Sequence, residues 1–199
     1  MNEFRTRVAQ AIYTASRAHD GVQRDRLLRF RNVEPATAEL LAILILGGGY
    51  QNVLEIGTSN GYSTIWLADA VEATGGRVVS VEILEQRTLQ ARINLERAGL
   101  LDRVQLLTED AAETLRRSAD RAWQFIFVDA ERPAYVSYLP DLVRSLAAGG
   151  MLAVDNVISH GPELTDFTAA VEADKRLTQT VIPVGAGLRL AVRRRGAAR

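Results

Sequence analysis

The sequence contains no cysteine, and it has a single lysine, Lys175, among its 24 basic residues. Without cysteine the chain can have no disulfide framework, no thiolate metal site and no cysteine nucleophile. Arginine supplies the other 23 basic residues, and a guanidinium stays protonated in proteins. The composition therefore restricts which side chain can act as a base.

Long apolar runs and an excess of either charge are also missing. The longest uninterrupted apolar run extends only from Leu40 to Leu46, whereas a membrane span needs about 18 residues. Glu3 and Arg5 interrupt any apolar segment at the N-terminus, so we expect no signal peptide and a cytoplasmic protein. The 24 basic and 24 acidic residues cancel, which argues against a general nucleic-acid or membrane-surface binder.

The length of 199 residues, with 47% hydrophobic and 24% charged residues, is typical of one globular domain. Apolar residues recur at helical spacing up to about Asp20, and a charged connector follows from Arg24 to Arg31. A second apolar helix is expected from Pro35 to the glycines at 47–49. We expect a single domain over residues 1–199, with N-terminal helices at 1–49 and an α/β core at 50–199.

From Asn52 onward, short apolar runs alternate with helical patterns, which predicts a parallel sheet covered on both faces. We expect a helix from Tyr135 to be capped by Gly149-Gly150, and a last helix from Glu163 to Lys175. A final hairpin would add an antiparallel strand. The expected strands are Val53–Ile56, Val78–Val81, Val104–Leu107, Phe125–Val128, Met151–Val154, Val181–Ile182 and Leu188–Val192.

The loop after the first expected strand carries glycines in the spacing G-x-x-x-G. Gly57 permits a sharp turn, and a helix that begins near Gly61 offers free N–H groups to an anionic group. A dinucleotide site has the pattern G-x-G-x-x-G, whose second glycine admits the pyrophosphate, but Ser59 takes that place here. The loop therefore favours a ligand with a small carboxylate over a nicotinamide dinucleotide.

Acidic residues lie in or directly after the first three strands. Glu82 ends the second strand, where a carboxylate commonly binds ribose hydroxyls, although a solvated glutamate is the simpler interpretation of this residue alone. Glu55 adds negative charge beside the glycine loop, which favours a cationic ligand such as a sulfonium. Asp110 and Ala111 follow the third strand, where an adenine could lie against backbone amides, and Asp110 can also cap the next helix.

Three oxygen-bearing side chains end the next two strands. Asp129 ends the fourth strand, and Asp155 and Asn156 end the fifth. Adjacent strands lie about 4.8 Å apart, so the three side chains can converge on one point. Two carboxylates and an amide oxygen suit Mg²⁺, Mn²⁺ or Ca²⁺ rather than zinc. A single aspartate after a strand often only caps the next element, so the metal interpretation depends on all three residues.

The segment VLEIGTSNGYSTIWLA resembles the first motif of the class I methyltransferases that use S-adenosyl-L-methionine. It is most similar to the cation-dependent O-methyltransferases of the catechol and caffeoyl-CoA type. The similarity continues through FIFVDAERPAYVSYL, GGMLAVDNV and TVIPVGAGLRLAV, and covers roughly residues 35–193. It implies a Rossmann-like α/β fold with a seven-stranded, mostly parallel sheet and an antiparallel last strand. It also implies methyl transfer to a hydroxyl.

The resemblance also implies roles for single residues. Ser63 would lie near the cofactor carboxylate, Glu82 would hold the ribose, and Asp110 and Ala111 would flank the adenine. Asp129, Asp155 and Asn156 match the family's ligands for its divalent cation, for which Mg²⁺ is expected, with Ca²⁺ or Mn²⁺ as alternatives. The cofactor-binding set implied in this way is Glu55, Gly57, Thr58, Ser59, Gly61, Tyr62, Ser63, Glu82, Asp110, Ala111 and Asp129.

Two positions depart from the family pattern. Three residues after the metal aspartate the family usually has a lysine, regarded as the general base, but this chain has Arg132, which cannot abstract a proton. We expect Arg132 to act with Asp129 at the catalytic position, as a charge that stabilises the oxyanion. Ser159 stands where plant-type relatives often carry a large aromatic residue. The next residue, His160, is a candidate base, although a solvated loop histidine is the simpler interpretation.

The predicted function is O-methylation of a small, catechol-like hydroxylated acceptor, assisted by a divalent cation. One alternative is a cofactor-binding protein that has lost catalysis, which Arg132 suggests. The other is a nicotinamide-dependent oxidoreductase, against which Ser59 and the Asp155-Asn156 pair both count. We expect a small-molecule acceptor, no nucleic-acid or membrane partner, and a homodimer, because the apolar stripes of residues 1–49 exceed what one sheet face can cover.

Overall fold

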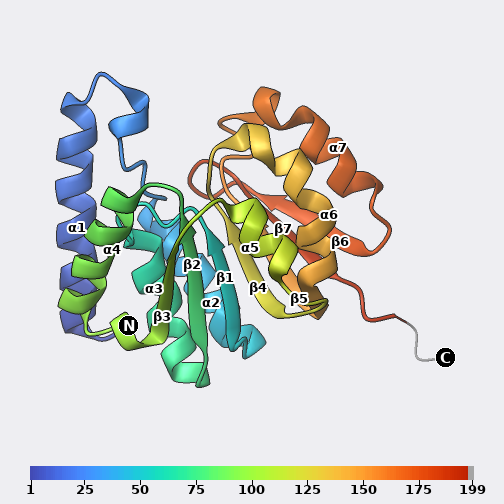
Figure 1. The fold of residues 1–199 in the computed structure, drawn as a ribbon, viewed down its shortest axis with the longest axis horizontal. Coiled ribbons are helices and arrows are strands. Elements are labelled where there is room, and N and C mark those ends of the chain that lie inside the picture. Colours follow the sequence, from blue (N-terminus) through green and yellow to red (C-terminus); the bar gives the residue numbers. More distant parts are fainter. Residues whose placement is uncertain (197–199) are drawn as a thin grey trace.

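The computed structural model describes residues 1–196, in which seven strands form one sheet flanked by helices (Figure 1). The strand order is β3-β2-β1-β4-β5-β7-β6. The strands are β1 (Asn52–Ile56), β2 (Arg77–Glu82), β3 (Val104–Thr108), β4 (Trp123–Val128), β5 (Leu146–Val154), β6 (Leu177–Ile182) and β7 (Leu188–Arg193).

Strands β1 to β5 are parallel, and β7 is the strand that runs antiparallel to its neighbours β5 and β6. The chain starts at β1 in the middle of the sheet, builds outward to β3, and returns to β4 on the other side of β1. This reversal is a topological switch point, and ligands of open α/β sheets bind at the carboxyl ends of the strands beside it. The predicted seven-stranded, mostly parallel sheet with an antiparallel last strand is confirmed.

The helices cover both faces of the sheet (Figure 1). Side chains of β1 alternate between two cores, with Val53 in the core under α1 to α4 and Leu54 in the core under α5 to α7. Strict alternation along a strand produces this division. The helices are α1 (Glu3–Val22), α2 (Pro35–Gly48), α3 (Tyr62–Thr74), α4 (Glu85–Ala98), α5 (Ala111–Arg117), α6 (Tyr135–Ser145) and α7 (Thr165–Ala173).

The two N-terminal helices end close to the positions that the sequence predicts, α1 at Val22 and α2 at Gly48. Asn2 caps α1 by accepting a hydrogen bond from the backbone N–H of Arg5 at 2.9 Å, and Pro35 begins α2. Gly49 ends α2 in the left-handed conformation with φ of 62°. Within residues 1–196 no helix combines the length and the apolar character needed to cross a membrane.

The main error of the sequence prediction lies at β5. This strand begins at Leu146 rather than Met151, and Gly149-Gly150 lies inside it instead of capping α6. The register between β4 and β5 shifts here, and a Cβ on Gly150 would lie 2.9 Å from two carbonyl oxygens. The bulge in this crowded strand therefore requires glycine at position 150. In the sequence alone, a pair of glycines after a helical pattern indicates a helix cap instead.

The bounds of the last helix and of β6 were also predicted wrongly. A 3₁₀ turn at Gly161–Leu164 replaces the expected first turn of α7, and α7 ends at Ala173 rather than Lys175. Strand β6 begins at Leu177, where mostly polar residues form an edge strand without a long apolar run.

Candidate active site

A cavity of about 650 Å³ lies at the carboxyl ends of the parallel strands. Loops after β1, β2, β3, β4 and β5 surround it, and the connector between α1 and α2 forms a further wall. Many of the residues predicted for the site line this one cavity: Gly57, Ser59, Ser63, Glu82, Asp110, Ala111, Asp129, Arg132, Asp155, Asn156, Ser159 and His160. The topology therefore brings the predicted cofactor and metal residues to a common space.

Gly57 makes the turn that opens the cavity after β1. Its φ of 102° lies in the region that favours glycine, and a Cβ at this position would lie 2.1 Å from the carbonyl oxygen of Asp129. The loop is bound to β2, since the N–H groups of Gly57 and Thr58 both donate to the carbonyl of Val81. The backbone of β1 and β4 can approach this closely only with glycine here.

Glu82 fixes the next loop beside the first. One carboxylate oxygen accepts from the backbone N–H of Ser59 at 2.9 Å, and the other accepts from that of Leu84 at 3.0 Å. The residue is 5% exposed and lines the cavity. Each carboxylate oxygen has a further lone pair, so Glu82 can accept hydrogen bonds from ligand hydroxyls while it holds the loop.

Glu55 lies behind the glycine loop and is not among the residues that line the cavity. Its carboxylate is completely buried and accepts from the hydroxyls of Ser63 and Thr64 at 2.5 Å and Ser80 at 2.6 Å. Burial raises its pKa from 4.5 to about 7, although these hydroxyls oppose the shift. Glu55 therefore positions the first turn of α3, including Ser63, which does line the cavity.

Three more residues of the predicted cofactor set also lie outside the lining. Thr58 is 1% exposed, and its hydroxyl pairs with that of Ser80 at 2.6 Å. Gly61 lets α4 approach, since a Cβ there would lie 3.1 Å from Ala91. Tyr62 is 2% exposed and packs on Tyr13 with ring centroids 5.2 Å apart. These residues shape the loop from the core side, which a motif alone does not distinguish from contact with a ligand.

Asp110 and Ala111 line the end of the cavity beside β3. The Asp110 carboxylate accepts from the backbone N–H of Ala112 at 2.8 Å, so it caps α5 as the sequence suggests. The hydroxyl of Tyr138 reaches the same oxygen from α6 at 3.4 Å. A cap and a ligand contact are compatible, because both residues remain on the cavity wall.

Asp129, Asp155 and Asn156 lie together at the opposite end. The Asn156 amide donates to Asp129 Oδ1 at 2.7 Å, and Asp155 Oδ1 is buried without a hydrogen-bond partner within residues 1–196. Burial and the nearby Asp155 charge raise the pKa of Asp129 well above its usual range, and burial raises that of Asp155 to about 6. An unpaired buried carboxylate oxygen beside a second carboxylate fits a divalent cation.

A cation at this place needs oxygen ligands beyond the two carboxylates. Within the described part of the chain no group of three histidine, cysteine, aspartate or glutamate side chains is arranged to hold a metal ion. Asn156 is the third oxygen-bearing side chain at this place, and its amide nitrogen faces Asp129 in this structure. Asn156 has φ of 68°, a conformation that asparagine tolerates better than most residues.

Arg132 begins a 3₁₀ turn after β4 and also lines this end of the cavity. Its Nε donates to Glu163 at 2.8 Å, and its side chain is 3% exposed. His160 lies nearby on the lining, with Nδ1 2.8 Å from the Ser159 hydroxyl. Lys175 is exposed beyond α7 and outside the lining, so it does not replace the lysine that is missing at position 132.

Sequence reasoning missed the part that the connector plays. Residues 24–31 were expected to form a solvated connector or a short helix, and a 3₁₀ turn at Arg26–Leu28 does form there, but Phe30 and Arg31 line the cavity. The Asp20 carboxylate accepts from the N–H groups of both residues, at 2.7 and 2.8 Å. The leucines and phenylalanine in RLLRF were the available signal, since a solvated connector does not need them.

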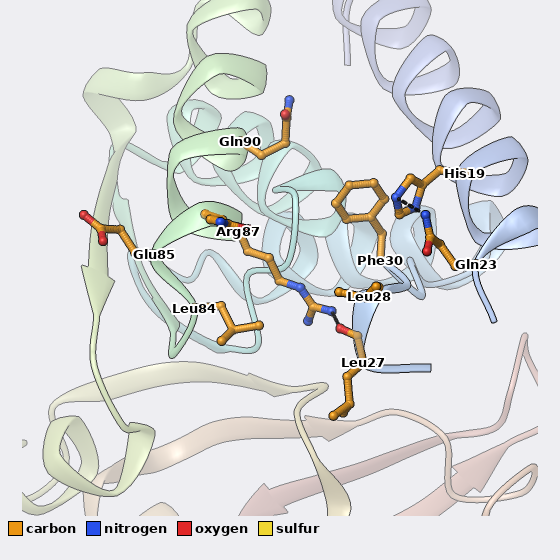
Figure 2. Close-up of a pocket in the computed structure, with 10 residues that line it drawn as sticks. His19, Gln23, Leu27, Leu28, Phe30, Leu84, Glu85, Arg87 and Gln90 are labelled. Carbon is orange, nitrogen blue, oxygen red and sulfur yellow. Dashed lines mark hydrogen bonds between the residues drawn. The ribbon is translucent and has the colours of Figure 1, made fainter. Parts of the chain in front are cut away.

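A second cavity of about 490 Å³ lies behind the connector, between α1 and α4 (Figure 2). Arg87 reaches from α4 across it and donates to the carbonyls of Leu27 at 2.6 Å and Arg29 at 2.8 Å. On the other side, Phe30 packs on His19 with ring centroids 4.5 Å apart. Side chains from both helices thus hold the connector against the active-site cavity.

Two features define the class I methyltransferase fold. One is the sheet order with its reversed strand β7, and the other is the glycine turn after β1, which is bound to the Glu82 carboxylate at the switch point. A sequence profile of the O-methyltransferase family matches residues 20–194. The chain belongs to the O-methyltransferase family.

Individual relatives agree with this assignment. A catechol O-methyltransferase of Mycobacterium tuberculosis is 39% identical over 139 residues, which are 68% of this chain and 63% of that protein. A catechol O-methyltransferase of Niastella koreensis is 33% identical over 150 residues, which are 73% of this chain and 67% of that protein. The chain therefore spans about two thirds of the length of these relatives.

A solved structure covers more of the chain. The O-methyltransferase of Bacillus cereus, determined in complex with SAH, superposes with a TM-score of 0.80 at 28% identity. The superposition covers 94% of this chain and 90% of that one.

Proposed function

We propose that the chain transfers the methyl group of S-adenosylmethionine to a hydroxyl of a small acceptor, with a divalent cation at Asp129, Asp155 and Asn156. One observation carries this proposal: the glycine loop with Glu82 and the three oxygen-bearing residues share one cavity. A cofactor at one end and an acceptor at the other would therefore meet without a domain movement.

The cofactor end has a donor or acceptor for each part of the cofactor. The N-terminus of α3, with the Ser63 hydroxyl held by Glu55, suits the carboxylate of the methionine part. Glu82 suits the ribose hydroxyls, and Asp110 and Ala111 border the space for the adenine. SAH is bound in the Bacillus cereus relative, and a relative from Streptomyces achromogenes, 26% identical with a TM-score of 0.79, was solved with SAM.

The acceptor end would orient a hydroxyl between the connector and the ends of β4 and β5. A divalent cation held there would lower the pKa of a coordinated hydroxyl and fix its position for displacement at the sulfonium methyl. Asp129 and Asp155 would hold the ion, and the connector covers the space from the other side. A catechol-like acceptor fits, because two adjacent oxygens can bind one cation, and the two relatives above are named for catechol.

Two alternatives have different support. A cofactor-binding protein without turnover stays a candidate because Arg132 replaces the family's lysine. A nicotinamide-dependent oxidoreductase loses support, since Ser59 occupies the position of the glycine that would admit a pyrophosphate.

We propose a small-molecule acceptor as the partner, with no nucleic-acid or membrane partner, and a cytoplasmic location.

The test is transfer of label from methyl-labelled S-adenosylmethionine to a panel of catechols and flavonoids, with Mg²⁺ or with EDTA. We expect transfer with Mg²⁺, loss of transfer in EDTA, and loss of turnover in Asp155→Ala with nearly intact cofactor binding. Asp174→Ala is the matched control, because Asp174 lies after α7 and pairs with Arg176 outside the cavity. No transfer to any acceptor would overturn the function, and undiminished activity in EDTA would overturn the role of the cation.

A further inference from the structure

Arg132 has an unusual set of contacts for a buried arginine. A guanidinium carries five N–H donors. Within residues 1–196 only the Nε–H of Arg132 has a partner, the Glu163 carboxylate at 2.8 Å, and Nη2 is buried without one. The side chain is 3% exposed, whereas that of Glu163 is 46% exposed, so the charge of the arginine lies on the buried side of the pair.

A buried donor without a partner costs roughly 1–3 kcal/mol, and more when the group is charged. The nearest explanation is a ligand that enters the cavity and accepts from Arg132. Asp155 lines the same cavity, and its Oδ1 is also buried without a partner within residues 1–196, yet the two groups do not bond to each other. The carboxylate side fits a cation, and the guanidinium side fits an anion. An ionised ligand oxygen would satisfy Arg132, and a cation between that oxygen and Asp155 would satisfy the carboxylate.

We propose that Arg132 binds an ionised hydroxyl oxygen of the acceptor, so that the site selects acceptors with acidic hydroxyls. This inference rests on the proposed function and specifies its substrate class. Arginine cannot remove a proton, but it forms strong charge-assisted hydrogen bonds to oxygen anions. An acceptor that binds in its ionised form needs no side-chain base. The structure thereby accounts for an arginine at this position.

Glu163 is a positioning residue in this scheme. It belongs to the 3₁₀ turn Gly161–Leu164 and holds the Nε of Arg132, which leaves the Nη groups free. A purely structural ion pair between the two turns is the competing explanation. It would make Arg132 important for folding but not for the ionisation state of a bound acceptor.

The experiment uses 4-nitrocatechol, whose absorbance changes when a hydroxyl ionises, so the state of the bound ligand is seen without turnover. The full-length protein with SAH is titrated at a pH below the ligand's own first pKa, once with Mg²⁺ and once with EDTA. We expect the wild type to bind the ionised form in both series, and more weakly in EDTA, because no cation then offsets the charges of Asp129 and Asp155. Arg132→Gln should weaken that binding by about tenfold or more, the usual worth of a hydrogen bond to a charged group.

Three further variants separate a binding role from a structural one. Arg132→Lys keeps a positive charge and should retain part of the spectral change. Glu163→Gln keeps an oxygen that can accept from Nε and should behave almost as the wild type, whereas Glu163→Ala should weaken binding of the ionised form. Arg116→Gln is the matched control, since Arg116 is 62% exposed on α5 and pairs with Glu113. Thermal unfolding of each variant reports whether it is folded.

Each outcome decides the question. The inference is overturned if a folded Arg132→Gln variant binds ionised 4-nitrocatechol as tightly as the wild type does. It is also overturned if the wild type binds only the neutral form. If catechols are methylated but Arg132 has no effect on ionised ligand, the inference fails and the proposed function stands. If no acceptor is methylated but ionised ligand binding depends on Arg132, the proposed function fails and the anion site stands.

Discussion

Glu82 is the carboxylate that ties the loops after β1 and β2 to each other and to the cavity. Removing it takes away an acceptor for ligand hydroxyls and frees two backbone N–H groups. We predict that Glu82→Ala weakens S-adenosylmethionine binding by about 1.5–3 kcal/mol, the typical worth of a charge-assisted hydrogen bond, with or without metal. Calorimetry measures this, with the exposed Glu96→Ala on α4 as control. Unchanged affinity in Glu82→Ala, or no binding by the wild type, would contradict the prediction.

Glu55 gives the free energy of unfolding a dependence on pH. Its pKa is raised in the folded state from 4.5 to about 7, mainly by burial, so the folded protein binds its proton more tightly than the unfolded chain. Its contribution to stability is therefore fully present below pH 4.5 and is lost as the pH rises through about 7.

Glu55→Gln keeps the shape of this side chain and cannot ionise. We predict that the variant gains stability relative to the wild type across that pH range, by an amount on the order of 1–3 kcal/mol. Urea unfolding at several pH values in EDTA measures the difference, and Glu96→Gln should show no such trend. A constant difference between Glu55→Gln and wild type at all pH values would mean that Glu55 ionises normally.

At the scale of the elements, the central part of the fold could be predicted because its signals are local. The strands β1, β2 and β4 are short apolar runs, and Gly57 marks a turn that only glycine allows. The start of β5 could not be predicted, because Gly149-Gly150 serves a bulge whose partner strand is far away in the sequence. Glycine after a helix is compatible with a cap or with a bulge, and only the pairing with β4 decides.

The residues of the candidate site also divide into those that the sequence predicts and those that it does not. Asp129, Asp155 and Asn156 could be placed together from sequence, because each follows a strand and the strand ends share an edge. The burial of Glu55 could not, since it depends on hydroxyls from α3 and β2. The connector and Glu163 were missed as well, because their contacts with the cavity are made across long stretches of sequence.

At the scale of the whole molecule, the N-terminal helices leave apolar side chains uncovered. Ile43 is 62% exposed and Leu46 is 46% exposed, three residues apart on one face of α2. Phe4 on α1 is 54% exposed. The inner faces of both helices already contribute to the core, since Ala9, Ile12, Leu41 and Ile45 are buried there. The uncovered side chains therefore point away from this chain's own sheet.

We predict that a second copy of the chain covers this face of α2. Light scattering at micromolar concentration should give about twice the chain mass of 21.8 kDa for the wild type. Ile43→Asp should give a folded protein of single-chain mass, because a buried unpaired carboxylate in an interface is costly. Val136→Asp is the matched control, since Val136 is 45% exposed on α6, among the helices of the other face, and should not change the mass. A wild-type mass near 21.8 kDa, or a dimer that persists in Ile43→Asp, would show that α2 does not form the interface.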